Sequence, residues 1–181
     1  MGGMIAQLLA AEFPHRVASL TSIMSSSGRR GLPGPTRAAR KVLMQRPKAP
    51  YHRVQIIDQF VRTFQVIGSP GFPTDEKHLR ERIALSMDRG FYPEGTSRQL
   101  LAIAASGSRA QQLRKIAAPS LIIHGAADPL VPLACGEDTA ASIAKSEIRI
   151  IAGMGHDLPL ALLPKIGAMV SAHCKGQGIP H

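Results

Sequence analysis

A short aliphatic run followed by a turn with one acid is the most constraining stretch of this sequence. Within residues 119–132, the run at 121–123 is typical of a strand buried on both faces of a parallel sheet. Gly125 is expected to end this strand, so Asp128 follows at its carboxyl end, where open α/β sheets carry their functional groups. Pro132 suits the first turn of a helix, because the nitrogen there needs no hydrogen-bond partner.

The stretch 148–157 repeats this order of strand, glycine turn and one titratable side chain, His156. Two successive parallel strands would therefore bring Asp128 and His156 to the same edge of one sheet. Such a pair forms two thirds of a nucleophilic triad, in which the acid fixes the imidazole tautomer and the histidine moves protons for a nucleophile. Taken singly, the acid is better explained as a helix cap and the histidine as a loop residue. Their matching contexts favour catalysis.

The order of acid then histidine is that of α/β-hydrolases, and residues 124–132 and 153–157 resemble this superfamily. The first residues, Met1-Gly2-Gly3, resemble the half of the G-x-S-x-G nucleophile motif that follows the serine. The resemblance implies a serine immediately before Met1 and a Met1 backbone N–H that donates to the oxyanion hole. We therefore expect a C-terminal portion of such a hydrolase, produced by a mis-set start, a truncation or gene decay.

The resemblance implies an α/β fold of about three parallel strands with flanking helices and a helical cap. The expected division is 1–28 for the nucleophile-elbow helix and the next strand (17–23), 29–112 for the cap, and 113–181 for the C-terminal core with the acid and histidine loops. Cap helices are expected at 36–45, 51–67, 74–88 and 96–106. Residues 95–107 resemble the end of the cap in a bacterial subgroup that includes aclacinomycin methylesterase.

The second predicted cap helix and the serine-rich loop after the first strand carry two further expectations. Val54, Ile57, Phe60, Val61 and Phe64 recur at three- and four-residue spacing, which predicts one buried helix face. The serine-rich loop at 25–27 either lines a substrate pocket or, as we favour, is a flexible connector. It lacks the strained elbow that would expose a nucleophile.

The net charge of +10 is concentrated in residues 29–62, which hold nine Lys and Arg against one acid, Asp58. A nucleic-acid or membrane surface is one explanation. A solvated cap surface is favoured, because the span has few aromatic residues and no RNA-binding motif. No apolar run is long enough to span a membrane, and two cysteines without zinc-ligand spacing fit a reduced, cytoplasmic protein.

The resemblance implies hydrolysis of a small-molecule carboxylic ester by a Ser-His-Asp mechanism whose serine is missing from these residues. No cofactor, metal or nucleic-acid partner is implied. The 181 residues alone are expected to be nearly inactive. The alternatives are a catalytically dead remnant that acts as a binding or interaction module, a basic nucleic-acid-binding protein, or peptidase, haloperoxidase or dehalogenase chemistry. The strand at 17–23 would present an unpaired edge, which predicts oligomers or aggregates.

Overall fold

The computed structural model describes residues 1–45, 47 and 49–180. Their elements, in chain order, are α1 (Gly2–Glu12), the 3₁₀ helix η1 (Pro14–Arg16), β1 (Leu20–Ile23), α2 (Arg37–Met44), α3 (Arg53–Ile67), α4 (Glu76–Arg89), α5 (Pro93–Ser106), α6 (Ala110–Leu113), β2 (Ser120–Gly125), α7 (Leu133–Ser142), β3 (Ser146–Ile151), the 3₁₀ helix η2 (Leu160–Leu162) and α8 (Leu163–Cys174).

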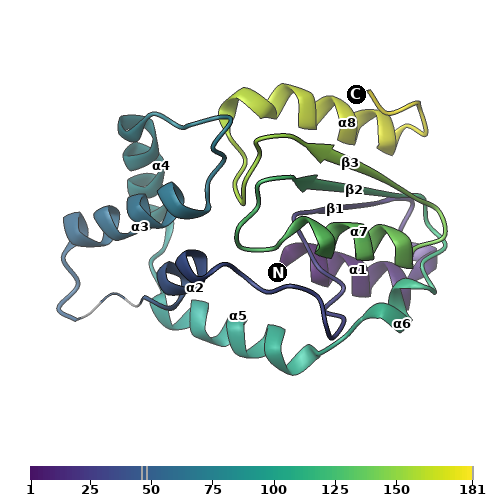
Figure 1. Ribbon diagram of the computed structural model, residues 1–181, viewed down its shortest axis with the longest axis horizontal. Coiled ribbons are helices and arrows are strands. Elements are labelled where there is room, and N and C mark those ends of the chain that lie inside the picture. Colours follow the sequence, from purple (N-terminus) through teal and green to yellow (C-terminus); the bar gives the residue numbers. More distant parts are fainter. Residues whose placement is uncertain (46, 48, 181) are drawn as a thin grey trace.

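In the described residues the strands form one parallel three-stranded sheet in the order β1-β2-β3. The central strand, β2, is buried at every position. Its alternate side chains enter two separate cores, as the two-residue period of a strand requires. The sheet is covered by α1 and α7 on one face and by α8 on the other (Figure 1). The predicted α/β class with three parallel strands is confirmed.

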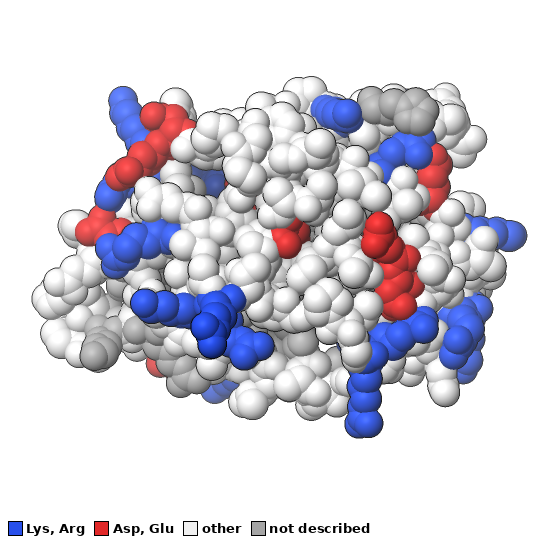
Figure 2. Space-filling view, in the orientation of Figure 1, with Lys and Arg blue, Asp and Glu red and all other residues white. Residues whose placement is uncertain are grey.

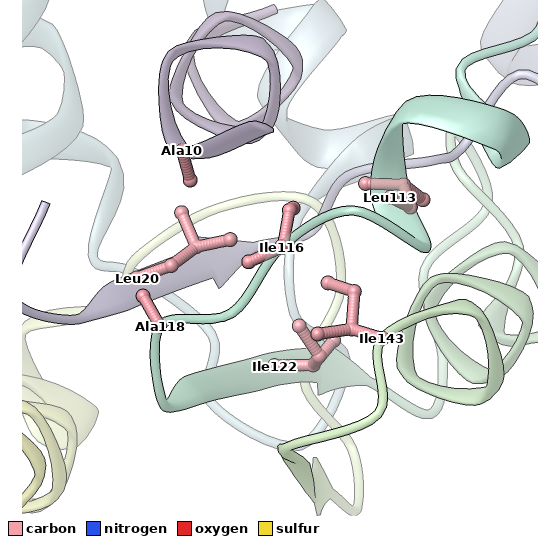
Figure 3. Close-up of a cluster of buried hydrophobic side chains, with 7 residues drawn as sticks. All are labelled: Ala10, Leu20, Leu113, Ile116, Ala118, Ile122 and Ile143. Atoms are coloured by element: carbon pink, nitrogen blue, oxygen red, sulfur yellow. The ribbon is translucent and has the colours of Figure 1, made fainter. Parts of the chain in front are cut away.

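The two cores lie on opposite faces of β2. On the face covered by α1, Ile122 packs with Leu20, Ala10 of α1 and Leu113 of α6 (Figure 3). On the other face, Leu121 and Ile123 pack with residues of α8, including Ile166 and Met169. This aliphatic packing holds the carboxyl ends of the strands, from which the loops with the titratable residues emerge.

The helices α2 to α5 are inserted in the chain between β1 and β2, and they lie beyond the carboxyl ends of the strands (Figure 1). The division at 28/29 and 112/113 remains a prediction. The second of these boundaries cuts α6, which begins at Ala110 and contacts α1.

The bounds of several elements differ from the expected ones by two or three residues. The strand predicted at 17–23 begins only at Leu20, because Val17 still closes η1 through a hydrogen bond from its N–H to the Pro14 carbonyl. The helix predicted at 51–67 begins at Arg53, and the one predicted at 96–106 begins at Pro93. Proline is favoured at that first helical position.

The buried face of α3 is rotated from the one that the sequence indicates. Val61 is buried as expected, but Val54 and Phe60 are exposed, at 68% and 38%. Ile56 and Ile67 are buried in their place. The apolar residues of this helix therefore lie on two faces, one buried in the core and one exposed.

Basic side chains lie at both ends of the face seen in Figure 2, over the insertion and over the opposite end of the sheet. Two of the bases in residues 29–62 are neutralised by acids from outside that span, in the ion pairs Arg29–Asp138 and Arg53–Asp88. Two of the nine bases, Arg46 and Lys48, lie outside the described residues. In the part of the chain that the structure describes, no helix has the length and apolar character needed to cross a membrane.

Candidate active site

Asp128 is held by the turn that follows β2. Its Oδ1 accepts hydrogen bonds from the backbone N–H groups of Leu130 and Val131, both at 2.8 Å. Its side chain is fully buried, and its Oδ2 lies 2.7 Å from Nδ1 of His156. All of these contacts place donors around the carboxylate, so they fix the orientation of the acid side chain.

His156 follows β3, and its Nδ1 faces Asp128 as the paired strand ends predict. An ionised carboxylate can only accept, so Nδ1–H donates to Asp128, and in the neutral ring Nε2 keeps its lone pair. The side chain is 25% exposed. Within the described residues no hydrogen bond to Nε2 is present, so this nitrogen is available to a reacting group.

The main chain around His156 is held by the helical insertion. The His156 N–H donates to the carbonyl of Ile67, the last residue of α3, at 2.7 Å. The neighbouring Gly155 N–H donates to the Ser69 hydroxyl at 2.9 Å, and that hydroxyl donates to Asp157 at 2.5 Å. Residues on both sides of His156 are therefore fixed by a segment far away in the sequence.

Glycines allow this segment to lie directly on the histidine loop. A Cβ on Gly155 would lie 2.1 Å from the Gly68 carbonyl oxygen, and one on Gly71 would lie 2.9 Å from the Gly153 Cα. The Gly71 N–H also donates to the Gly153 carbonyl at 2.9 Å. We call residues 67–71 together with 153–157 the histidine clamp.

His124, in β2, is a residue of the site that sequence reasoning passed over. It is fully buried, its Nε2 donates to the Val131 carbonyl at 2.8 Å, and the same atom is 3.8 Å from Oδ2 of Asp128. A Cβ on Gly136 would lie 2.4 Å from its Nδ1, so the start of α7 must carry glycine to make room. A histidine inside an otherwise aliphatic strand was the available signal.

Met1 precedes α1, on the side of the sheet to which the strands point (Figure 1). Its carbonyl accepts from the Met4 N–H, and Gly3 lies so close to the end of β1 that a Cβ there would approach the Ser25 Cβ to 2.7 Å. Small residues at the start of this helix therefore allow it to approach the sheet closely. The role of the Met1 backbone N–H in an oxyanion hole remains a prediction.

The serine-rich loop after β1 is packed rather than exposed. Ser27 is fully buried and its hydroxyl donates to Asp138 at 2.5 Å, while Ser25 is 4% exposed. Within residues 1–45, 47 and 49–180, no serine hydroxyl is hydrogen-bonded to His156. The loop is therefore part of the framework and brings no nucleophile to the histidine.

A cavity of about 380 Å³ is lined by the chain neighbours of Asp128 and His156, but the side chains of these two residues are not among those that line it. Ala127, Pro129 and Asp157 line it from the two loops, and residues of α3 and α4, among them Phe64 and Arg82, line it from the insertion. Its size is that of a small-molecule site. In the described part of the chain, no three His, Cys, Asp or Glu side chains gather in a way that could hold a metal ion.

The parallel sheet, the inserted helices and the acid–histidine pair at the strand ends together define an α/β hydrolase. Residues 1–160 match the alpha/beta hydrolase fold family, and the chain belongs to it. Among curated proteins it is similar to rhodomycin D methylesterase DauP of Streptomyces sp. (strain C5), with 25% identity over 97% of this chain and 64% of that protein. Rhodomycin D methylesterase DnrP of Streptomyces peucetius is 23% identical over the same shares.

Solved structures of other proteins have the same fold as this chain. A meta-cleavage product hydrolase variant from Pseudomonas fluorescens IP01 superposes with a TM-score of 0.72 at 17% identity, over 96% of this chain and 61% of that one. A lipase-like protein from Acinetobacter baumannii AYE gives 0.69 at 18% identity, over 97% and 59%. The chain spans 64% of the length of the curated methylesterases that it matches.

Proposed function

We propose that this chain supplies the acid and the base of a hydrolase that cleaves a small-molecule carboxylic ester through a Ser-His-Asp triad. The observation that carries the proposal is the 2.7 Å contact between Oδ2 of Asp128 and Nδ1 of His156. Two further facts support it: the family is one of hydrolases, and two curated relatives are named as methylesterases.

In this mechanism, Nε2 of His156 removes the proton from a serine hydroxyl as its oxygen attacks the ester carbonyl carbon. Asp128 stays ionised and stabilises the imidazolium that forms. The imidazolium then gives its proton to the departing alcohol, which leaves an acyl-serine. Water attacks the acyl carbon with His156 again as the base, and its proton returns to the serine oxygen as the carboxylic acid is released.

The nucleophile in this proposal is a serine that directly precedes Met1 in a longer protein. The Met1-Gly2-Gly3 resemblance supports this position. The Met1 backbone N–H would then donate to the oxyanion of the tetrahedral intermediate. Removal of one triad member costs on the order of 10⁴-fold or more in turnover, so the 181 residues alone are expected to be nearly inactive.

The proposal is tested by comparing hydrolysis of 4-nitrophenyl acetate by the 181-residue chain and by a protein extended through the reading frame upstream of Met1. The extended protein should carry Gly-x-Ser before Met1 and turn over the ester. His156→Ala should abolish its turnover, whereas His78→Ala, an exposed position on α4, should leave it unchanged.

Three outcomes would count against the proposal. An upstream frame without Gly-x-Ser, or an inactive extended protein, would favour the non-catalytic binding module. Turnover by the 181 residues alone that a serine-directed phosphonate blocks would mean that the nucleophile lies within this chain.

A further inference from the structure

None of the aromatic side chains of this protein is a buried core residue, although Phe64 and Phe72 pack against two hydrophobic clusters. All five Phe and two Tyr lie in the described residues, and none is buried. Four of them instead line one cavity of about 430 Å³: Phe60, Phe64, Phe91 and Tyr92. Aromatic rings contribute most to binding and stability when they are removed from water, so rings gathered around a cavity indicate a ligand site.

This cavity, which we call the aromatic cavity, lies within the insertion. Its walls come from α3, α4 and the residues around Phe91 that lead into α5, with Ile83 and Met87 of α4 adding apolar surface. Its volume is within the range of small-molecule sites, roughly 300–1,000 Å³.

The aromatic cavity has a positive charge in its wall and no acidic residue among those that line it. The charge belongs to Arg82 of α4, whose guanidinium carbon lies 5.3 Å from the centroid of the Phe64 ring. Among the described residues, no carboxylate lies within ion-pair distance of Arg82, whereas Arg80, two positions earlier, pairs with both Asp58 and Glu76. The guanidinium of Arg82 is therefore an unneutralised planar cation in the wall of the aromatic cavity.

We propose that the aromatic cavity binds an aromatic carboxylate, with its ring among the Phe and Tyr side chains and its carboxylate on Arg82. The guanidinium matches a carboxylate with two parallel hydrogen bonds, and it favours ring faces as well. Phe64 and Arg82 also line the cavity that the chain neighbours of Asp128 and His156 line, so the carboxylate end of the ligand would lie at the wall that both cavities share. This binding needs no turnover and does not depend on the proposed ester hydrolysis.

The test measures binding of 2-naphthoate to the 181-residue chain by fluorescence anisotropy, which the absence of tryptophan keeps free of protein background. Two comparison ligands separate the parts of the proposal: 2-naphthylmethanol lacks the charge, and octanoate, which does not fluoresce and is measured by its displacement of 2-naphthoate, lacks the ring. Each is expected to bind about tenfold more weakly than 2-naphthoate, which corresponds to about 1.4 kcal/mol for the lost ion pair or ring contact.

Variants locate the site. Arg82→Gln should weaken 2-naphthoate about tenfold and leave 2-naphthylmethanol unchanged, whereas Arg89→Gln on the same helix, which removes the same charge outside the cavity, should change neither. Phe60→Leu should weaken both ligands, and Phe13→Leu, at the end of α1, should weaken neither. Circular dichroism of each variant separates loss of binding from loss of folding.

Four results would overturn the proposal. They are no binding of 2-naphthoate at millimolar concentration, binding of octanoate as tight as that of 2-naphthoate, equal binding of the neutral naphthyl ligand, or a folded Arg82→Gln protein with unchanged affinity. The second of these would indicate a fatty-acid site.

Discussion

Removing the carboxylate of Asp128 tests how the site is held together without requiring any turnover. In Asp128→Ala, three donors lose their acceptor: the N–H groups of Leu130 and Val131 and the Nδ1–H of His156. Hydrogen bonds to a charged group contribute about 1.5–3 kcal/mol each, but these half-buried donors regain water in part. We therefore expect the free energy of unfolding to fall by about 3 kcal/mol.

Asp128→Asn should cost much less, about 1 kcal/mol, because the amide oxygen can still accept from Leu130 and Val131. The amide NH₂ then faces His156, which must accept at Nδ1 and carry its proton on Nε2. Urea unfolding at pH 7 measures both variants. With a slope of about 2 kcal/mol per molar urea, the midpoints should fall by about 1.5 M for alanine and 0.5 M for asparagine. Imidazole ¹⁵N shifts report the tautomer of His156.

The control is Asp88→Asn, which removes one carboxylate from an exposed ion pair with Arg53 and should change stability little. Equal destabilisation by Ala and Asn at position 128 would refute the role of its side chain as the acceptor for the turn. An unchanged His156 tautomer in the Asn variant would refute the contact between the two catalytic candidates.

Three further predictions concern the histidine clamp, the thiols and the sheet edge. Ser69→Ala should lower the free energy of unfolding by about 1–3 kcal/mol, because it leaves the buried Gly155 N–H without an acceptor; unchanged urea unfolding would contradict this. Burial raises the pKa of the Cys135 thiol, so less of it is thiolate at pH 8, and iodoacetamide should modify the exposed Cys174 first; peptide mass spectrometry showing equal rates would be evidence against this. In the described residues β1 pairs only with β2, so the 181-residue chain should self-associate, and light scattering should show less association for Thr21→Lys; a wild-type monomer at high concentration would disprove it.

The sequence was sufficient to predict the sheet and the acid–histidine contact, because both follow from short-range patterns. An aliphatic run such as 121–123 has few alternatives to a buried strand, and parallel strands bring their carboxyl ends to one edge. Once the two strands are assigned, the proximity of Asp128 and His156 follows from topology alone.

The histidine clamp and the aromatic cavity could not be predicted in this way. The Ser69–Gly155 contact joins residues 86 positions apart and rests on a fit between two glycine-containing loops, which leaves no periodic pattern. The spacing of Phe60 and Phe64 on α3 was visible, but periodicity does not distinguish a ring that faces a core from one that faces a cavity. His124 did carry a signal, as a histidine inside an aliphatic strand, but its burial depends on the space left by Gly136, which the sequence does not reveal.

The histidine clamp limits how this α/β-hydrolase fold could be remodelled. Exchanging the whole helical insertion between related proteins would replace Ile67, whose carbonyl accepts from the His156 N–H, and Gly68, whose backbone lies against Gly155. A workable graft therefore keeps residues 67–71 from the recipient and takes only the helices on either side of them from the donor.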